Sequence, residues 1–186
     1  MHAVIGILLA LFGRTSSGRG QVVDVSIFES VYNMMESVVP EYSAEKVIRE
    51  PSGSTLTGIV PTNTYLCSDG KYVVIGGNGD SIYKRLMTCA GRQDLADDKR
   101  MADNAGRVEH ESEIDKAISK WTAEIVSSEV LETLENAAVP CGPIYSVEDM
   151  FSDPHYHARG LFESIDYAGG QLDVAAIHPR LSKTPG

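Results

Sequence analysis

The chain opens with a continuous apolar run at residues 2–12, which is followed by Gly13-Arg14. Glycine directly after an apolar run is a common helix stop, so the pattern predicts a buried helix. The run is too short to cross a bilayer as a helix. It also lacks the preceding positive charge and the small-residue cleavage site of a signal peptide. Because nothing ahead of this helix could cover it, we expect the sequence to be cut from a longer protein.

The spacing of apolar residues changes after a polar, glycine-bearing turn. Residues 21–25 are β-branched and mostly apolar, which is typical of a strand in a buried parallel sheet. From residue 26 to about residue 44, apolar side chains recur three and four positions apart, so a helix is expected, and Pro40 should kink or end it. The order helix, glycine turn, strand indicates an α/β protein.

Shorter elements are predicted along the rest of the chain. Asp69-Gly70 between two apolar runs indicates a hairpin, and Ser146 can cap a short helix. Two prolines and a glycine at residues 139–144 mark a boundary. The expected elements are hairpin strands at 64–67 and 71–75, helices over 81–90, 109–121 and 128–138, and strand-like runs at 161–166 and 171–177.

Composition narrows the class of protein. The 186 residues carry a formal net charge of −10, which argues against a nucleic-acid or membrane-surface binder, because phosphate groups repel an acidic surface. The three cysteines, Cys67, Cys89 and Cys141, form no C-x-x-C pair. Their odd number suits a reducing compartment, so a cytoplasmic protein is expected.

Two segments suggest chemistry of their own. The glycines of residues 76–79 follow a strand and open a helix, where backbone N–H groups can face an anion. This segment is neither a dinucleotide fingerprint nor a P-loop, so a tight turn is the favoured interpretation. Cys141 in Pro-Cys-Gly-Pro is a candidate nucleophile, although a small buried hydrophobic residue is the favoured interpretation here too.

Histidines and carboxylates offer weaker candidates. His155 and His157 could hold one metal ion only on a strand, whereas Asp153-Pro154 predicts a helix start, so no metal site is expected. The acidic residues near Glu111 lie in charged stretches that are expected to be solvated. From the residues alone, the reaction stays open.

Several phrases in order resemble the family III coenzyme A transferases, and together they cover essentially the whole chain. They are Ala10-Leu11-Phe12-Gly13-Arg14, Gly18-Arg19-Gly20-Gln21, Val23-Asp24-Val25-Ser26, Tyr65 with Asp69-Gly70-Lys71-Tyr72-Val73, Gly91-Arg92 with Leu95, Asp98, Arg100, Asn104 and Arg107, Val139-Pro140-Cys141-Gly142-Pro143, Asp153-Pro154-His155, Ala158-Arg159-Gly160, and Pro179 with Leu181-Ser182 and Thr184-Pro185-Gly186. Met101 stands where the family usually has Phe.

The resemblance implies a covalent transfer of CoA from an acyl-CoA to a small carboxylic acid. In the family, an Asp carboxylate attacks the thioester, giving a mixed anhydride and then an enzyme–CoA thioester. That Asp and most CoA contacts are expected upstream of Met1, so no catalytic residue is assigned here. No permanently bound cofactor is expected, and the CoA thioester is a substrate. The family also implies a homodimer of interlocked chains.

The resemblance assigns a substrate loop to Gly53, Ser54 and Thr55, by position in the family's glycine-rich loop. The departure from a pure glycine run argues against specificity for formate and oxalate. Racemase relatives of the same fold carry a Glu near the position of Gly79, which is absent here, so a transferase is favoured over an α-methylacyl-CoA racemase. A non-catalytic interaction module is the alternative from another class.

The resemblance also implies a division of the chain. Residues 1–25 belong to a larger nucleotide-binding-like α/β domain, and residues 26–57 form a linker helix and the glycine-containing loop. Residues 58–138 form a small α+β domain with antiparallel strands and helices. Residues 139–186 return toward the large domain.

Overall fold

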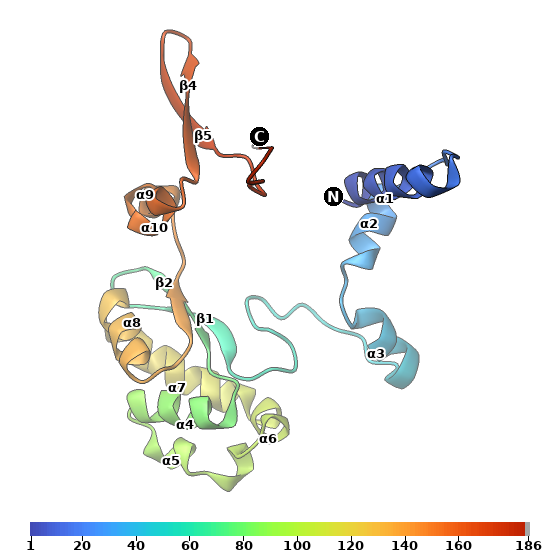
Figure 1. Ribbon diagram of the computed structural model, residues 1–186. Coiled ribbons are helices and arrows are strands. Elements are labelled where there is room, and N and C mark those ends of the chain that lie inside the picture. The colour runs from blue at the N-terminus through green and yellow to red at the C-terminus, as the bar shows by residue number, and fades with distance from the viewer. Residues whose placement is uncertain (185–186) are drawn as a thin grey trace. The chain divides into compact units, whose positions relative to one another are not determined.

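A computed structural model describes residues 1–184 of the chain (Figure 1). The chain divides into two compact units, one of residues 1–52 and one that begins at Gly53. Helices and small antiparallel sheets make up the regular structure, in agreement with the α/β class expected from the sequence.

The first unit is a series of three helices, α1 (His2–Ser17), α2 (Ile27–Asn33) and α3 (Val38–Glu45). The apolar run forms α1 as expected, but the expected stop at Gly13 is wrong, because the helix continues to Ser17. Gly18 ends it in the left-handed conformation that glycine adopts easily. No residue of α1 is buried among the described residues, and Phe12 is 76% exposed. The apolar surface of α1 is therefore uncovered in the part of the chain that the structure describes.

Two expectations for this unit are wrong. Residues 21–25 are extended but form no strand, because no described strand lies beside them to complete a hydrogen-bond ladder. The helix expected over residues 26–44 is interrupted between α2 and α3, ahead of Pro40. Pro40 instead lies in the first turn of α3, where the missing backbone N–H would have no helical partner in any case.

The second unit contains a three-stranded antiparallel sheet in the order β1-β2-β3. The strands are β1 (Thr62–Leu66), β2 (Tyr72–Gly76) and β3 (Cys141–Pro143), and the β1–β2 hairpin confirms the Asp-Gly prediction. The boundary expected at residues 139–144 does follow a helix end, but Cys141–Pro143 forms β3 and pairs with β2.

Helices cover this sheet and supply most of the hydrophobic core. They are α4 (Asp80–Cys89), α5 (Gln93–Ala96), a 3₁₀ helix (Lys99–Met101), α6 (Asn104–Glu109), α7 (Glu111–Ala123) and α8 (Ser127–Asn136). Helix α7 packs on β1, and α8 packs on β2 and β3. Core side chains such as Ile75, Leu86 and Ile118 are fully buried, as the apolar faces of the sequence predicted.

The chain then continues through two short helices and a second hairpin. Helices α9 (Val147–Ser152) and α10 (Pro154–Ala158) precede strands β4 (Phe162–Tyr167) and β5 (Gly170–Ala175), which pair as expected. Ser146 caps α9 in a reciprocal capping box with Asp149. Strand β5 is the last regular element of the described chain.

Candidate functional site: a loop held by a polar network

The expected substrate loop lies at the start of the second unit, just before β1. Gly53 and Gly58 both have positive φ angles, 66° and 81°, which glycine reaches without the strain that a Cβ atom would introduce. Ser54 is exposed, and Thr55 is partly buried. The two glycines give the loop its sharp turns.

A chain of hydrogen bonds joins this loop to β1 and α7. The Ser54 hydroxyl donates to Asn63 Oδ1 at 2.6 Å, and Asn63 Nδ2 donates to Asp115 Oδ2 at 3.0 Å. The Tyr65 hydroxyl donates to the other Asp115 oxygen at 2.6 Å. One carboxylate on α7 thus holds two neighbouring β1 side chains, and one of these holds the loop.

The far end of the loop is fixed separately. Asn104 Nδ2 donates to the Gly58 carbonyl at 2.9 Å, and Asn104 Oδ1 accepts from the Val60 backbone at 3.1 Å. The backbone N–H of Leu56 donates to the Thr62 carbonyl at 3.1 Å. Residues 54–60 are therefore anchored at several points within one unit.

Burial and charge perturb the groups around Asp115. Burial, followed by the hydrogen bond to Asp115, raises the pKa of Tyr65, so its phenol keeps its proton. Burial also raises the pKa of Glu111, with a further contribution from the Asp115 charge one helical turn away. The expectation that the acidic residues here are fully solvated is wrong for Glu111, because it packs beside β1 and is partly buried.

The glycine turn at residues 76–79 is closed from within. The N–H groups of Gly76 and Gly77 donate to the carbonyls of Pro140 and Pro61, each at 2.9 Å. A Cβ atom on Gly77 would lie 2.5 Å from Leu86 Cδ2. These contacts support the interpretation as a tight turn rather than an anion site, since two of the N–H groups are already used.

Arg107 holds this turn to the rest of the unit, and its side chain is fully buried. The guanidinium donates to the carbonyls of Val60 at 2.9 Å, Met101 at 3.2 Å and Asn78 at 2.7 Å, and to Asp80 Oδ1 at 2.9 Å. It also lies over a tyrosine ring, 5.2 Å from the centroid. This pattern is that of a structural arginine.

The structure does not place the remaining candidate residues in a catalytic arrangement. All three cysteines are free, and burial raises the pKa of Cys141, which disfavours the thiolate a nucleophile needs. His155 and His157 lie on α10, where two positions apart do not share a face. Among the described residues, no cluster of histidines, cysteines and carboxylates could hold a metal ion, and no helix is long and apolar enough to cross a membrane.

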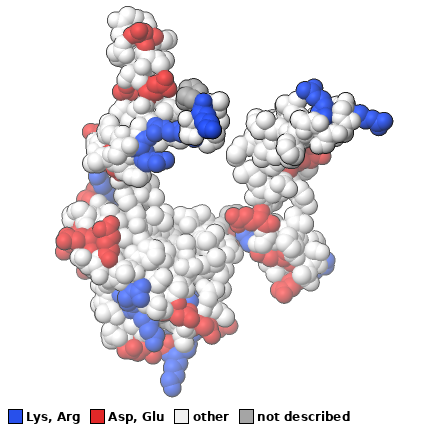
Figure 2. Space-filling model, in the orientation of Figure 1, with Lys and Arg blue, Asp and Glu red and all other residues white. Residues whose placement is uncertain are grey.

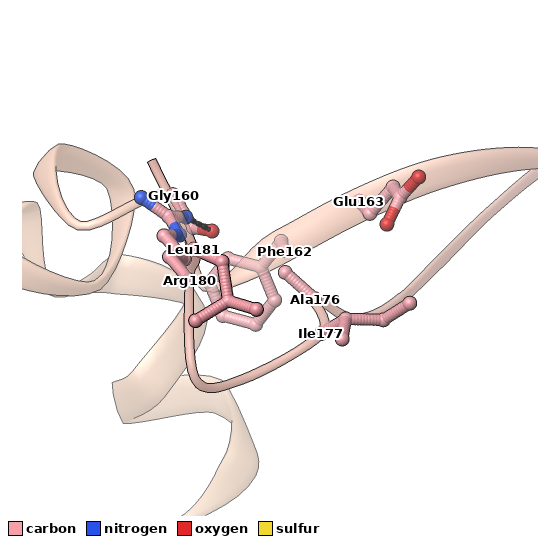
Figure 3. A pocket seen from close by; sticks show the side chains of 7 residues that line it. All are labelled: Gly160, Phe162, Glu163, Ala176, Ile177, Arg180 and Leu181. Atoms are coloured by element: carbon pink, nitrogen blue, oxygen red, sulfur yellow. Dashed lines mark hydrogen bonds between the residues drawn. The ribbon is translucent and has the colours of Figure 1, made fainter. Parts of the chain in front are cut away.

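A pocket of about 540 Å³ lies between the start of β4 and the segment after β5 (Figure 3). It brings together Gly160 and Leu181, which belong to separate parts of the closing sequence signature. Arg180 donates to the Gly160 carbonyl, and Figure 3 shows the Glu163 carboxylate lying apart from that guanidinium. Among the described residues that line the pocket, no acidic group and basic group are therefore paired.

Charged side chains do not gather into one basic surface on the face that Figure 2 shows. Lys and Arg form small separate groups there, with Asp and Glu between them.

Comparison with known proteins identifies the fold and the family. The model of CoA-transferase family III matches residues 1–186. The chain belongs to CoA-transferase family III. It is 40% identical over 185 residues to succinyl-CoA–D-citramalate CoA-transferase of Chloroflexus aurantiacus, covering 99% of this chain and 46% of that protein.

Further members of CoA-transferase family III agree. The chain is 34% identical over 187 residues to the alpha subunit of succinyl-CoA–L-malate CoA-transferase from Chloroflexus aurantiacus, covering all of this chain and 44% of that subunit. A CaiB/BaiF family protein from Brucella suis has the same fold, with a TM-score of 0.75 and 30% identity over 98% of this chain and 47% of that chain. The chain thus spans about half the length of the relatives it matches.

Sequence reasoning located the loop but not the network that holds it. Gly53, Ser54 and Thr55 were assigned by resemblance alone, and their role as a substrate loop stays a prediction. Asn63 and Asp115 were not singled out, because they are 52 positions apart and each looks like an ordinary polar residue. They are recognised only in the structure, where the amide on β1 faces the carboxylate on α7.

Proposed function

We propose that this chain is part of a CoA-transferase that moves CoA from an acyl-CoA to a small carboxylic acid, and that residues 53–58 line the site for the acid. The observation that carries the assignment of the loop is the hydrogen-bond chain from Ser54 through Asn63 to Asp115. Such a network holds an exposed hydroxyl in one place, which is what recognition of a small polar substrate requires.

The proposed reaction is covalent. An Asp carboxylate, supplied by protein outside these 186 residues, attacks the thioester carbonyl, forms a mixed anhydride and releases CoA thiolate. The thiolate attacks the aspartyl carbonyl of the anhydride, which gives an enzyme–CoA thioester and releases the first acid. The incoming carboxylate attacks this thioester, and the released thiolate then attacks the acyl carbonyl of the new anhydride, giving the new acyl-CoA and restoring Asp.

The first unit supports a role within a larger assembly. Its helices expose large apolar side chains, including Leu9, Phe12 and Phe28. Many exposed large apolar side chains on one segment are typical of a protein interface. We propose that protein outside these 186 residues covers them, in a homodimer of interlocked chains.

The test uses the natural gene product that contains these 186 residues. It is incubated with succinyl-CoA and a panel of small acids, and new CoA thioesters are measured by liquid chromatography. Transfer to at least one acid is expected. Intact-protein mass spectrometry should detect a CoA adduct, and peptide mapping should place it on an Asp outside residues 1–186. The isolated 186-residue chain should give no turnover. Transfer by the isolated chain, or an adduct within it, would overturn the proposed division of roles.

A further inference from the structure

The hydrogen-bond chain at the loop has a fixed direction, and that direction bears on which acids the site accepts. We propose that Asn63 and Asp115 turn Ser54 into a pure hydrogen-bond acceptor, so that the site selects acids that carry an alcoholic hydroxyl group. This inference rests on the proposed function, because it assumes that the loop faces the acid substrate.

Asn63 is held in one orientation by two neighbours on opposite sides of its amide. The Thr64 backbone N–H, which can only donate, lies 2.8 Å from Asn63 Oδ1. The Asp115 carboxylate, which can only accept when ionised, lies 3.0 Å from Asn63 Nδ2. Exchanging the oxygen and nitrogen of the amide would place donor against donor and acceptor against acceptor, so the amide cannot flip.

Tyr65 keeps Asp115 in place. Its hydroxyl donates to Asp115 Oδ1 at 2.6 Å, and the tyrosine side chain is buried, with 2% exposure. The raised pKa of Tyr65 means that this phenol stays a donor across the working pH range. The orientation of Asn63 is therefore set by groups that are themselves fixed.

The consequence for Ser54 follows from its single proton. The hydroxyl faces Asn63 Oδ1 at 2.6 Å, and because that atom only accepts, Ser54 must donate its proton there. Ser54 is exposed, and its hydroxyl oxygen can accept a hydrogen bond from a ligand. A ligand group that meets Ser54 must therefore be a donor.

Ionised carboxylic acids differ in whether they have such a donor. Both carboxylates of an unsubstituted dicarboxylate only accept, and they gain nothing from Ser54. The hydroxyl of a 2-hydroxy acid can donate to Ser54, and a neutral hydrogen bond of this kind contributes about 1 kcal/mol, or roughly fivefold in affinity.

The experiment compares two acids that differ only in the hydroxyl. The natural gene product is assayed with succinyl-CoA as donor and with citramalate or methylsuccinate as acceptor. The wild type should give a higher kcat/KM with citramalate. Ser54→Ala should lower the ratio of the two kcat/KM values about fivefold, mainly through KM for citramalate. Ser54→Thr keeps the hydroxyl and should retain the ratio, and Ser112→Ala, an exposed serine on α7, is the matched control.

A second variant tests the direction of the hydrogen bond rather than the presence of the hydroxyl. Asn63→Ala frees the Ser54 proton, so the serine can donate to a carboxylate. The ratio of kcat/KM for citramalate to kcat/KM for methylsuccinate should then shrink, because the freed hydroxyl can donate to a carboxylate of either acid. A purely structural role for Asn63 would instead lower both values together.

The possible outcomes test the proposed function and the further inference separately. No transfer to any acid by the wild type would overturn the proposed function, and the inference with it. Transfer to both acids, with Ser54→Ala lowering both values equally or leaving both unchanged, would overturn the inference and leave the proposed function standing. A wild-type preference for methylsuccinate over citramalate would likewise overturn the inference alone.

Discussion

Replacing Arg107 by Met should destabilise the second unit more than any other change to a charged side chain described above. Met keeps much of the buried volume but removes every donor. The carbonyls of Val60 and Met101 are buried where Arg107 meets them, whereas the bonds to Asn78 and Asp80 lie nearer the surface. Water can replace the second pair of bonds, but it cannot reach the first pair.

The magnitude follows from the two buried carbonyls. Each buried acceptor left without a donor costs about 1–3 kcal/mol, so Arg107→Met should lower the free energy of unfolding by about 4 kcal/mol. Since a domain of this size is stable by about 5–15 kcal/mol, the variant should lose a large share of its stability.

Arg85→Met is the matched control. Arg85 also donates to two backbone carbonyls, those of Ala137 and Ala138, at 2.7 and 2.8 Å. Its side chain is only partly buried, so water can satisfy these carbonyls, and the expected loss is about 1 kcal/mol.

Urea unfolding followed by tryptophan fluorescence measures both variants. Trp121 is the single tryptophan of the chain and packs against the core of this unit, so its signal reports on the relevant transition. A loss below about 1 kcal/mol for Arg107→Met, or a loss equal to that of Arg85→Met, would refute the reasoning from buried acceptors.

Three further predictions use the same unfolding assay. Gly106→Ala should destabilise the unit by about 3 kcal/mol, because its Cβ would lie 1.8 Å from the Arg100 carbonyl oxygen; a loss smaller than about 1 kcal/mol would contradict this. Thr62→Val should leave stability equal or higher, since the Thr62 hydroxyl is buried with no partner among the described atoms; a loss above about 1 kcal/mol would contradict it. Hydrogen bonds from Ser127 lower the pKa of Asp69, so its stabilisation is present above about pH 4 and is lost as pH falls through the lowered value. Asp69→Asn should remove that part of the acid sensitivity, and an unchanged pH profile would count against it.

Local patterns predicted most of the second unit. The hairpin depends on Asp69-Gly70 at its turn, and the helices on apolar spacing, so each is encoded within about ten residues. The capping box at Ser146 is local in the same sense. These features need no knowledge of distant contacts, and the structure confirms them.

Features that depend on contacts between residues far apart in the chain could not be predicted from the sequence. Residues 21–25 have the composition of a strand, but a strand needs a neighbour for its hydrogen bonds, and none is described beside them. Strand β3 is not predicted for the converse reason, because Cys141-Gly142-Pro143 after Pro140 looks like a loop until β2 lies next to it. The Asn63–Asp115 contact joins residues far apart in the chain, so no local pattern could indicate it.

The order of the small sheet also has a mechanical consequence. Strands β1 and β3 flank β2 and run in the same direction, with the chain entering β1 at Thr62, opposite Gly76, and leaving β3 at Pro143, opposite Val73. Tension between the entering and leaving segments therefore pulls along the strands and loads the cross-strand bonds in shear. Bonds loaded in this way resist together rather than unzipping one after another. A force on one connection should thus move the sheet together with the helices packed on it, α7 and α8, and pass the displacement to the other connection.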